Sequence, residues 1–526
     1  MSAPTPSPDV GAPEAAQPPR PDVRPLAAVA AVVTALAAFG ILPRWPGLVH
    51  LVALSPLDLV ADLRTLLALA PGYPTFVLGA LGSLALRTAV LAALLGRAGR
   101  VGLLVTLRFL LLIWPLALVA ALALHAAAAT LFYGLFWAGA GAALLLATLT
   151  AAVPWVREQA GAGIGVLLRH RLRLGTVLAY LAVLGGLGAL ADLAGQAGSV
   201  ALVPASALAT WGAARLLHEP DRLRLGRRVL ALMPVAGITA LAIVAATGPT
   251  EPPRAAAPQP EREGSLLLMS GIDSRSGSGA ILELDPHVLG HTCAATHQYS
   301  YAGPGQGQPA GDGICPSATG APYEEDDTLR SREELVPFLD QQLGELAPPV
   351  TAMTHSQGVW LAWEAAAEDR APGLETLVLV GAFPANPAAF PVDGDGPGRV
   401  IPDALALVEL LGRPGGTTIF EIDSPLTREW LAHPTAIERT LARPLPDGVR
   451  ALSVPSLFDV PLLPEGPEID GAVDACPVPV VHPNLPYSTE LLEAVERFRE
   501  GRSPPDCPAW RHAIGPAFRH LTAPPA

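Results

Sequence analysis

The feature that most constrains this chain is a series of long apolar segments that stops before the middle of the sequence. Each segment is about 20 residues long, the length that an α-helix needs to cross the hydrocarbon core of a bilayer. Seven of them lie near residues 26–43, 75–96, 101–124, 127–152, 174–194, 197–217 and 229–248. The sequence therefore predicts an all-α transmembrane bundle of about seven helices, followed by a domain of a different kind.

These segments divide the chain into four parts. Residues 1–24 are rich in Pro and Ala and poor in bulky apolar side chains, which predicts a disordered tail. The seven-span membrane domain occupies residues 25–248, and residues 249–264 form a Pro-rich polar linker. The remaining residues, 265–526, are numerous enough for one α/β domain with a buried sheet.

Residues 48–71 lie between the first two apolar segments and are also apolar, but Asp58, Asp62 and Arg64 interrupt them. An apolar helix with charged residues along it is typical of a helix that lies in the membrane interface. We therefore expect an amphipathic interfacial helix here rather than an additional span.

Two arginines, Arg87 and Arg108, lie inside predicted spans. A charge inside the membrane is costly, so each is a candidate functional residue by default. The alternative is that these side chains reach the headgroups or pair with an acidic residue, for which Asp192, Asp58 and Asp62 are available.

Arginine also predicts the orientation of the spans. The short loops that follow the second, fourth and sixth spans are rich in Arg, and the opposite loops are nearly free of it: the Arg-rich loops carry Arg97, Arg100, Arg157, Arg169, Arg171, Arg173, Arg222, Arg224, Arg227 and Arg228. Short cytoplasmic loops are enriched in positive charge. With seven spans, this pattern places the N-terminus in the cytoplasm and the C-terminal domain outside the cell.

The composition differs between the two halves. Up to residue 250, 17 Arg accompany nine acidic residues, for a net charge of +8; after it, 17 Arg accompany 38 acidic residues, for −21. An acidic domain repels phosphate, so nucleic-acid binding is disfavoured. Only 15% of all residues are charged, against about 25% in soluble domains, which excludes an ordinary soluble protein.

All four cysteines lie in the C-terminal domain, at Cys293, Cys315, Cys476 and Cys507. An even number confined to one domain predicts disulfides, which persist in oxidising compartments outside the cytoplasm. We expect local pairs, Cys293 with Cys315 and Cys476 with Cys507; free buried thiols are the alternative. The spacings do not match a zinc site, and we expect neither a metal nor a cofactor.

The C-terminal domain alternates short apolar runs with helical patterns. Strands are predicted at 265–270, 349–354, 374–382 and 449–460, and a helix with one apolar face over 326–346. This alternation is typical of a mostly parallel sheet with helices on both faces.

The most informative stretch is Thr354-His355-Ser356-Gln357-Gly358. A serine hydroxyl becomes a nucleophile only when it stands clear of the sheet, beside a base and beside backbone N–H groups that hold the oxyanion. A tight turn between a strand and a helix provides this position, and the sequence has strand, turn and helix in that order. We predict Ser356 to be the nucleophile and His355 to be a turn residue rather than a base.

Residues 265–500 thereby resemble the α/β-hydrolase superfamily, and the motif is most similar to that of its lipases and esterases. The family pattern is G-x-S-x-G, and Thr354 stands at its first Gly. The resemblance implies a triad in the order Ser, acid, His. Asp459, at the end of a predicted strand, is the expected acid and His482, in a later loop, the expected base, with Asp423 as the alternative acid.

The resemblance also implies an oxyanion hole made of two backbone N–H groups. One belongs to Gln357, which follows the nucleophile, and the other to Ile272, in the loop after the first strand. Residues 385–445 are expected to form a cap over the site that selects the substrate.

The sequence thus predicts a multi-pass membrane protein with an extracytoplasmic serine hydrolase that cleaves esters through an acyl-enzyme. Its expected partners are the lipid bilayer and a small-molecule or lipid ester, with cell-envelope acyl groups included. Two other functions stay open: an inactive hydrolase-like module that binds or senses a ligand, and a transporter with an accessory outer domain. The sequence indicates no oligomeric state.

Overall fold

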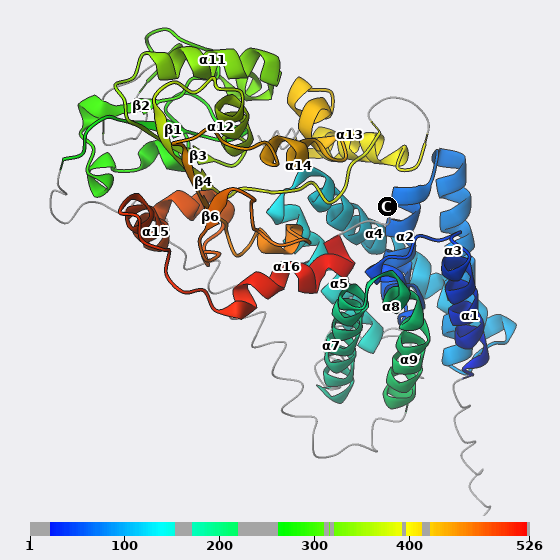
Figure 1. Cartoon of the computed structure of the whole chain (residues 1–526). Helices are drawn as coiled ribbons and strands as arrows, with labels where there is room; N and C mark the ends of the chain where they lie inside the picture. The colour runs from blue at the N-terminus through cyan, green and yellow to red at the C-terminus, as the bar shows by residue number, and fades with distance from the viewer. Residues whose placement is uncertain are drawn as a thin grey trace, which may run out of the picture.

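A computed structural model describes residues 22–152, 171–218, 261–309, 315, 320–391, 396–412 and 421–522. Within them, helices make up the chain as far as residue 218, and an α/β domain begins after residue 261 (Figure 1). The predicted seventh span at 229–248 lies outside the described residues, as do residues 1–21 of the predicted tail and residues 249–260 of the predicted linker.

The helical half differs from the prediction in the number of spans. Its elements are α1 (Arg24–Ala38), η1 (Pro46–Val52), α2 (Leu57–Leu69), α3 (Tyr73–Leu94), α4 (Arg100–Thr130), α5 (Tyr133–Ala152), α7 (Arg171–Leu193), α8 (Gly195–Ala201) and α9 (Val203–His218). Among the described residues, four segments are long and apolar enough to cross a membrane: Tyr73–Leu94, Arg100–Thr130, Gly175–Leu193 and Gly195–Leu217.

The prediction of seven spans is therefore not confirmed. The first predicted span is shortened because α1 ends before Gly40, which adopts a positive φ of 73°. The fourth predicted span, 127–152, is shortened because its first residues belong to α4, which continues to Thr130. Leu131 then turns the chain with a φ of 54°, and α5 begins at Tyr133.

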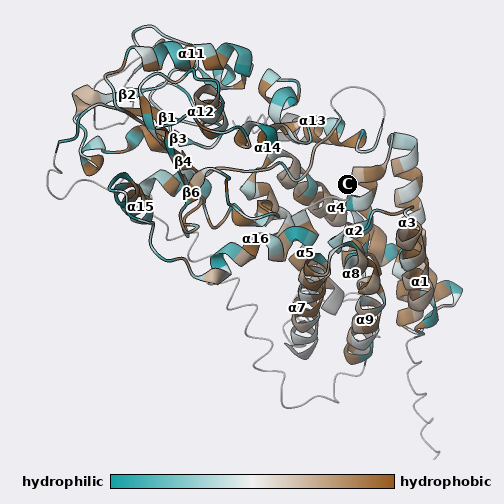
Figure 2. Ribbon diagram, viewed as in Figure 1, coloured by the Kyte–Doolittle hydropathy of each residue, from teal (hydrophilic) through white to brown (hydrophobic). Residues whose placement is uncertain are grey.

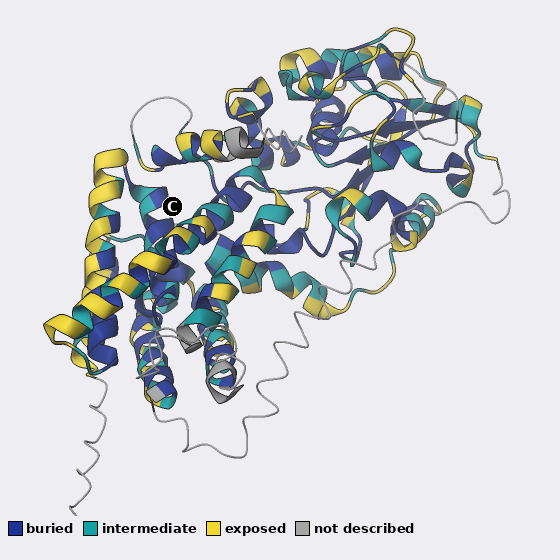
Figure 3. Ribbon diagram, turned by 180° about the vertical axis from the view of Figure 1, so that it is seen from behind, coloured by how far each residue is buried: buried dark blue, intermediate teal, exposed yellow. Residues whose placement is uncertain are grey.

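The outer surface of the helical half is apolar. Figure 2 shows that its helices consist mainly of apolar residues, and Figure 3 shows exposed residues along their outer sides. Exposed large apolar residues on α3 and α4 include Val77, Leu78, Leu81, Leu104, Val105 and Leu112. Extensive exposed apolar surface of this kind marks a protein that associates with a membrane.

The segment predicted to lie in the interface is instead buried inside the helical half. Asp58 on α2 is fully buried, and Arg87 on α3 lies against it, with its Nη1 3.2 Å from Asp58 Oδ2. The Arg87 guanidinium also binds Asp62 with two hydrogen bonds, of 2.7 and 2.6 Å. The amphipathic pattern of residues 48–71 is therefore explained by an internal ion cluster, and Arg87 has a structural partner, whereas Arg108 is exposed.

Replacing Arg87 by glutamine is expected to destabilise the helical half by about 3–5 kcal/mol, because two carboxylates would lose their buried cation. The measurement is the thermal unfolding midpoint of the full chain in detergent. Arg108→Gln, which removes an exposed arginine from the neighbouring helix, is the matched control and should leave the midpoint nearly unchanged. Equal midpoints for the two variants would contradict a stabilising role for the cluster.

The C-terminal half is built on a six-stranded parallel sheet with the order β2-β1-β3-β4-β5-β6. The strands are β1 (Ser265–Met269), β2 (Thr296–Gln298), β3 (Val350–His355), β4 (Leu374–Val380), β5 (Arg450–Val454) and β6 (Ala472–Asp474). The four predicted strands are present. Between the end of β6 at Asp474 and His482, Val478 forms an isolated bridge with Ser456.

Helices cover both faces of this sheet. The helices of the domain are α11 (Arg332–Gly344), α12 (Gly358–Ala367), α13 (Val400–Gly412), α14 (Ala436–Leu441), α15 (Thr489–Arg499) and α16 (Ala509–Thr522). α11 and α12 pack on one face, where Leu267 points, and α15 packs on the other, where Leu266 and Leu268 point. The predicted helix over 326–346 begins later, because Ser331 caps it by accepting the Glu334 N–H.

Two disulfides stabilise the α/β domain, and its last helix joins it to the helical half. Cys293 is bonded to Cys315 and Cys476 to Cys507, which confirms the predicted disulfides and their pairing. The C-terminal helix α16 does not pack on the sheet but lies against α7 of the helical half (Figure 1). Arg519 on α16 pairs with Asp192 on α7 at 3.3 Å, so the two halves are in direct contact.

Candidate active site

Ser356 occupies a sharp turn between β3 and α12. Its backbone has a positive φ of 56°, a conformation that costs energy for any residue with a side chain, and its N–H donates to Val380 O at 2.9 Å. Thr354 replaces the expected glycine without strain: it lies in the buried strand, and its hydroxyl donates to Val378 O at 3.1 Å. The turn therefore has the geometry that a nucleophilic serine requires.

The structure brings the predicted base and the predicted acid together. His482 is the first residue of the 3-10 turn η10 (His482–Tyr487), and its Nδ1 lies 2.5 Å from Asp459 Oδ2. Asp459 is only 1% exposed and precedes the short turn η9 (Val460–Leu462). Asp423, the alternative acid, has a side chain that is 87% exposed and pairs with Arg428. Of the two acids, Asp459 is the partner of His482.

Aromatic rings and a glycine fix the His482 imidazole. Its ring centroid lies 5.5 Å from that of Phe383 and 6.4 Å from that of Tyr133, both in stacked orientations. Gly381 has a φ of 67°, and a Cβ built there would lie 2.7 Å from His482 Cε1. Only glycine leaves room for the ring at this place.

Ser356 and His482 line one pocket, which has a volume of about 580 Å³. Within the described part of the chain, no hydrogen bond joins the Ser356 hydroxyl to His482, although His482 keeps its bond to Asp459. Catalytic hydrogen bonds are often long in the absence of substrate and tighten in the complex. We call this cavity the Ser356 pocket: the serine and the imidazole line it, and the imidazole is bound to the buried Asp459.

The two expected oxyanion donors lie beside the nucleophile. Gly271 packs so closely on Ser356 that a Cβ there would lie 2.7 Å from the serine Cβ, and Ile272 follows it in the pocket wall. Among the described residues, the N–H groups of Ile272 and Gln357 donate no hydrogen bond to the protein. Thr328 positions both loops, because its hydroxyl accepts the Asp273 N–H and its carbonyl accepts the Gln357 side-chain amide.

His355 differs from the prediction of a turn residue. It is the last residue of β3, is buried, and donates its Nε2–H to the main-chain oxygen of His482 at 3.1 Å. Burial, followed by the nearby His482, lowers the pKa of His355 to about 3. A neutral His355 therefore holds the backbone of His482 in place, a role that its position before Ser356 did not indicate.

We expect His355 to make the protein less stable in acid. In the unfolded chain this histidine binds a proton below pH 6.5, whereas in the folded protein it does so only near pH 3. Stability is therefore lost as the pH falls from about 6.5 toward 3, by about 1.4 kcal/mol per pH unit. His355→Gln keeps an N–H donor but removes the titration, so its unfolding midpoint should fall less between pH 7 and pH 4.5. Parallel pH profiles for the two proteins would contradict this assignment.

The helical half forms one wall of the Ser356 pocket. Residues 130–133, at the turn between α4 and α5, line it together with loops of the sheet. From the predicted cap at 385–445, Leu426 and Leu431 line the pocket. No sequence motif signalled the contribution of the α4–α5 turn, because it precedes Ser356 by more than 200 residues and is itself part of a predicted span.

Comparison of the chain with family models, with curated proteins and with solved structures finds no match. Three features characterise the Ser356 pocket: the strained serine turn, the buried imidazole–carboxylate pair, and the contact with the apolar helices.

Proposed function

We propose that this protein is a membrane-anchored serine hydrolase of the α/β-hydrolase type, which cleaves carboxylic esters through an acyl-enzyme. One observation carries the proposal: a serine in a strained strand-to-helix turn shares a pocket with an imidazole whose Nδ1 is bound to a buried carboxylate. The site lies at the carboxyl ends of β1 and β3, where strand order reverses and open α/β sheets bind their ligands.

The geometry supports the following reaction. Ser356 Oγ attacks the ester carbonyl carbon while His482 Nε2 takes the hydroxyl proton, and Asp459 stabilises the imidazolium. The N–H groups of Gln357 and Ile272 bind the carbonyl oxygen as it becomes negative. His482 then gives its proton to the departing alcohol, which leaves an acyl group on Ser356. Water then attacks the acyl carbon while His482 takes a proton from it. His482 returns this proton to Ser356 Oγ as the ester bond to the serine breaks, which releases the carboxylic acid.

The position of the pocket favours a lipid-like ester. Its wall at residues 130–133 continues into helices whose outer surfaces are apolar, and we propose that an acyl chain reaches Ser356 along this side. Phe132 lines the pocket on this side and is 37% exposed. We propose that it contacts the acyl chain of the substrate.

Phe132→Ala is expected to reduce the preference for long acyl chains. Without the ring, the acyl chain of the substrate loses apolar contact worth about 1–2 kcal/mol. The ratio of kcat/KM for a long-chain ester to that for a short-chain ester should therefore fall about tenfold. The measurement is a series of p-nitrophenyl esters of increasing length with the full chain in detergent. Phe39→Ala, which removes an exposed ring at the distant end of α1, should keep the wild-type ratio.

Covalent labelling with a fluorophosphonate tests the proposed activity. The wild-type chain should react, Ser356→Ala should not, and Ser503→Ala, which alters an exposed serine far from the pocket, should react like the wild type. Absence of label in the wild type would instead support an inactive module that binds or senses a ligand. The transporter hypothesis named Arg87 and Arg108 as its candidate residues, and of these Arg87 is paired with Asp58 and Asp62.

We further propose that the α/β domain lies outside the cytoplasm. Two disulfides support this location, because such bonds are rare in reducing compartments. Protease added to intact cells should degrade the domain, and in permeabilised cells it should do the same. Protection of the domain in intact cells, with degradation only after permeabilisation, would place it on the cytoplasmic side.

A further inference from the structure

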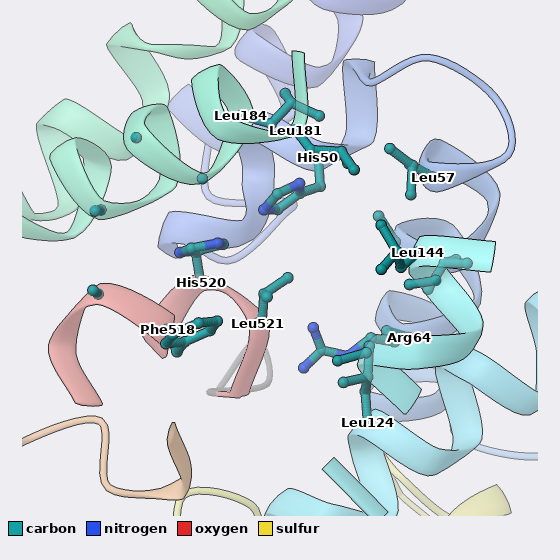
Figure 4. Close-up of a pocket in the computed structure, with 18 of the residues that line it drawn as sticks. His50, Leu57, Arg64, Leu124, Leu144, Leu181, Leu184, Phe518, His520 and Leu521 are labelled. Atoms are coloured by element: carbon teal, nitrogen blue, oxygen red, sulfur yellow. The ribbon is translucent and has the colours of Figure 1, made fainter. Parts of the chain in front are cut away.

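A second cavity lies between the helical half and the C-terminal helix α16, apart from the Ser356 pocket. It has a volume of about 490 Å³ and is lined by residues of η1, α2, α4, α5, α7 and the C-terminal helix α16 (Figure 4). Most of its lining is apolar, with Leu124, Leu144, Leu181 and Leu184 among the larger side chains. We call it the Arg64 pocket, after the one residue of its lining that carries a permanent charge.

Arg64 points into this cavity without a counter-ion. It is only 4% exposed, and its Nε and Nη2 are buried without a hydrogen-bond partner. Within the described part of the chain, no carboxylate pairs with it, in contrast to Arg87 one helix away, which has two. A guanidinium cannot lose its proton in a protein, and leaving it buried and unpaired costs several kcal/mol. A bound anion beside Arg64 would therefore be strongly stabilised.

Two histidines complete the polar part of the cavity. His50 on η1 and His520 on α16 both line it, with their rings stacked at a centroid distance of 5.0 Å. His50 Nε2 and His520 Nδ1 are buried without hydrogen-bond partners. Figure 4 shows Arg64 on one side of the cavity and the two imidazoles on the other, with apolar side chains around them. Unpaired polar atoms from three segments thus converge on an otherwise apolar space.

We propose that the Arg64 pocket binds a long-chain carboxylate, with its head on Arg64 and its acyl chain among the leucines. The guanidinium fork matches the two oxygens of one carboxylate, and an imidazole N–H supplies a further donor. The apolar walls accept a hydrocarbon chain and offer nothing to the polar substituents of a phospholipid headgroup. A pocket that is mainly apolar with a few converging polar groups is typical of a specific ligand site. This inference does not depend on the proposed hydrolase activity.

Photoaffinity labelling of the full chain in non-ionic detergent tests this site. A diazirine-bearing palmitic acid should label the wild type, and oleate should compete, whereas methyl oleate, which lacks the charge, should not. Arg64→Gln should lower labelling about tenfold or more, because it removes a charge-assisted bidentate contact. Ser356→Ala should label like the wild type, which separates this site from the hydrolase.

A second variant keeps the test valid if Arg64→Gln impairs folding. Gly185 lines the cavity, and a Cβ built there meets nothing within 4 Å, so a side chain begins in open space and Gly185→Leu is expected to occupy the space of the acyl chain. It should also lower labelling about tenfold at an unchanged unfolding midpoint. Arg108→Gln, on the exposed side of α4, should label normally.

Two results would overturn the proposal. One is wild-type labelling in both Arg64→Gln and Gly185→Leu, which would place the carboxylate elsewhere. The other is competition by phosphatidylglycerol or by inorganic phosphate as strong as that by oleate, which would assign the pocket to a phosphate group instead of a carboxylate.

Discussion

Ser356→Ala is expected to lower kcat for ester hydrolysis by a factor on the order of 10⁴ or more, because the variant has no hydroxyl to form the acyl-enzyme. The backbone of the turn should survive: alanine tolerates the same φ of 56° no worse than serine does, and the Ser356 hydroxyl makes no hydrogen bond within the described structure. The unfolding midpoint should therefore stay close to that of the wild type. The assay is the hydrolysis of p-nitrophenyl esters by the purified full chain.

The control for this variant is Ser503→Ala, which changes an exposed serine near the C-terminus. It should hydrolyse esters at the wild-type rate. If Ser356→Ala retained more than about a tenth of the wild-type kcat, another group would have to be the nucleophile, and the proposed mechanism would be wrong.

Asp459→Asn is expected to lower kcat by a factor on the order of 10⁴, with little effect on KM. The amide would no longer hold a hydrogen on His482 Nδ1, so the imidazole would adopt the wrong tautomer and lose the charge that stabilises its protonated form. The bond of 2.5 Å between His482 Nδ1 and Asp459 Oδ2 is the contact that the variant alters.

Asp423→Asn is the matched control, since Asp423 was the alternative acid and lies exposed beside Arg428. It should hydrolyse esters at the wild-type rate. A large loss of kcat in Asp423→Asn, together with a small one in Asp459→Asn, would show that the substrate-bound enzyme uses a different acid.

Much of the candidate site could be predicted because its requirements are local. A serine between a buried strand and a helix is a pattern that the sequence displays. Asp459 and His482 were expected because the resemblance implies the order Ser, acid, His, and in the structure both lie after strands of the same parallel sheet as Ser356. The disulfide pairs were predictable for a similar reason, since each joins cysteines close in sequence.

The errors come from contacts between distant segments. The acids of residues 48–71 resemble the polar side of an interfacial helix, but they bind Arg87 inside the helical half. Apolar length alone cannot tell where one helix ends and the next begins, and the turn at Leu131 made one predicted span shorter. In the same way, Arg64, His50 and His520 come from three separate segments, and only the packing of α16 against α7 brings them into one cavity.

The central claim is that Ser356, His482 and Asp459 act together on an acyl group. The most direct test is an experimental structure of the full chain after reaction with a fluorophosphonate. We predict phosphorus bonded to Ser356 Oγ, a phosphonyl oxygen within hydrogen-bond distance of the Gln357 and Ile272 N–H groups, and His482 still bound to Asp459. An adduct on a different residue, or an adduct on Ser356 with His482 turned away from it, would contradict the claim.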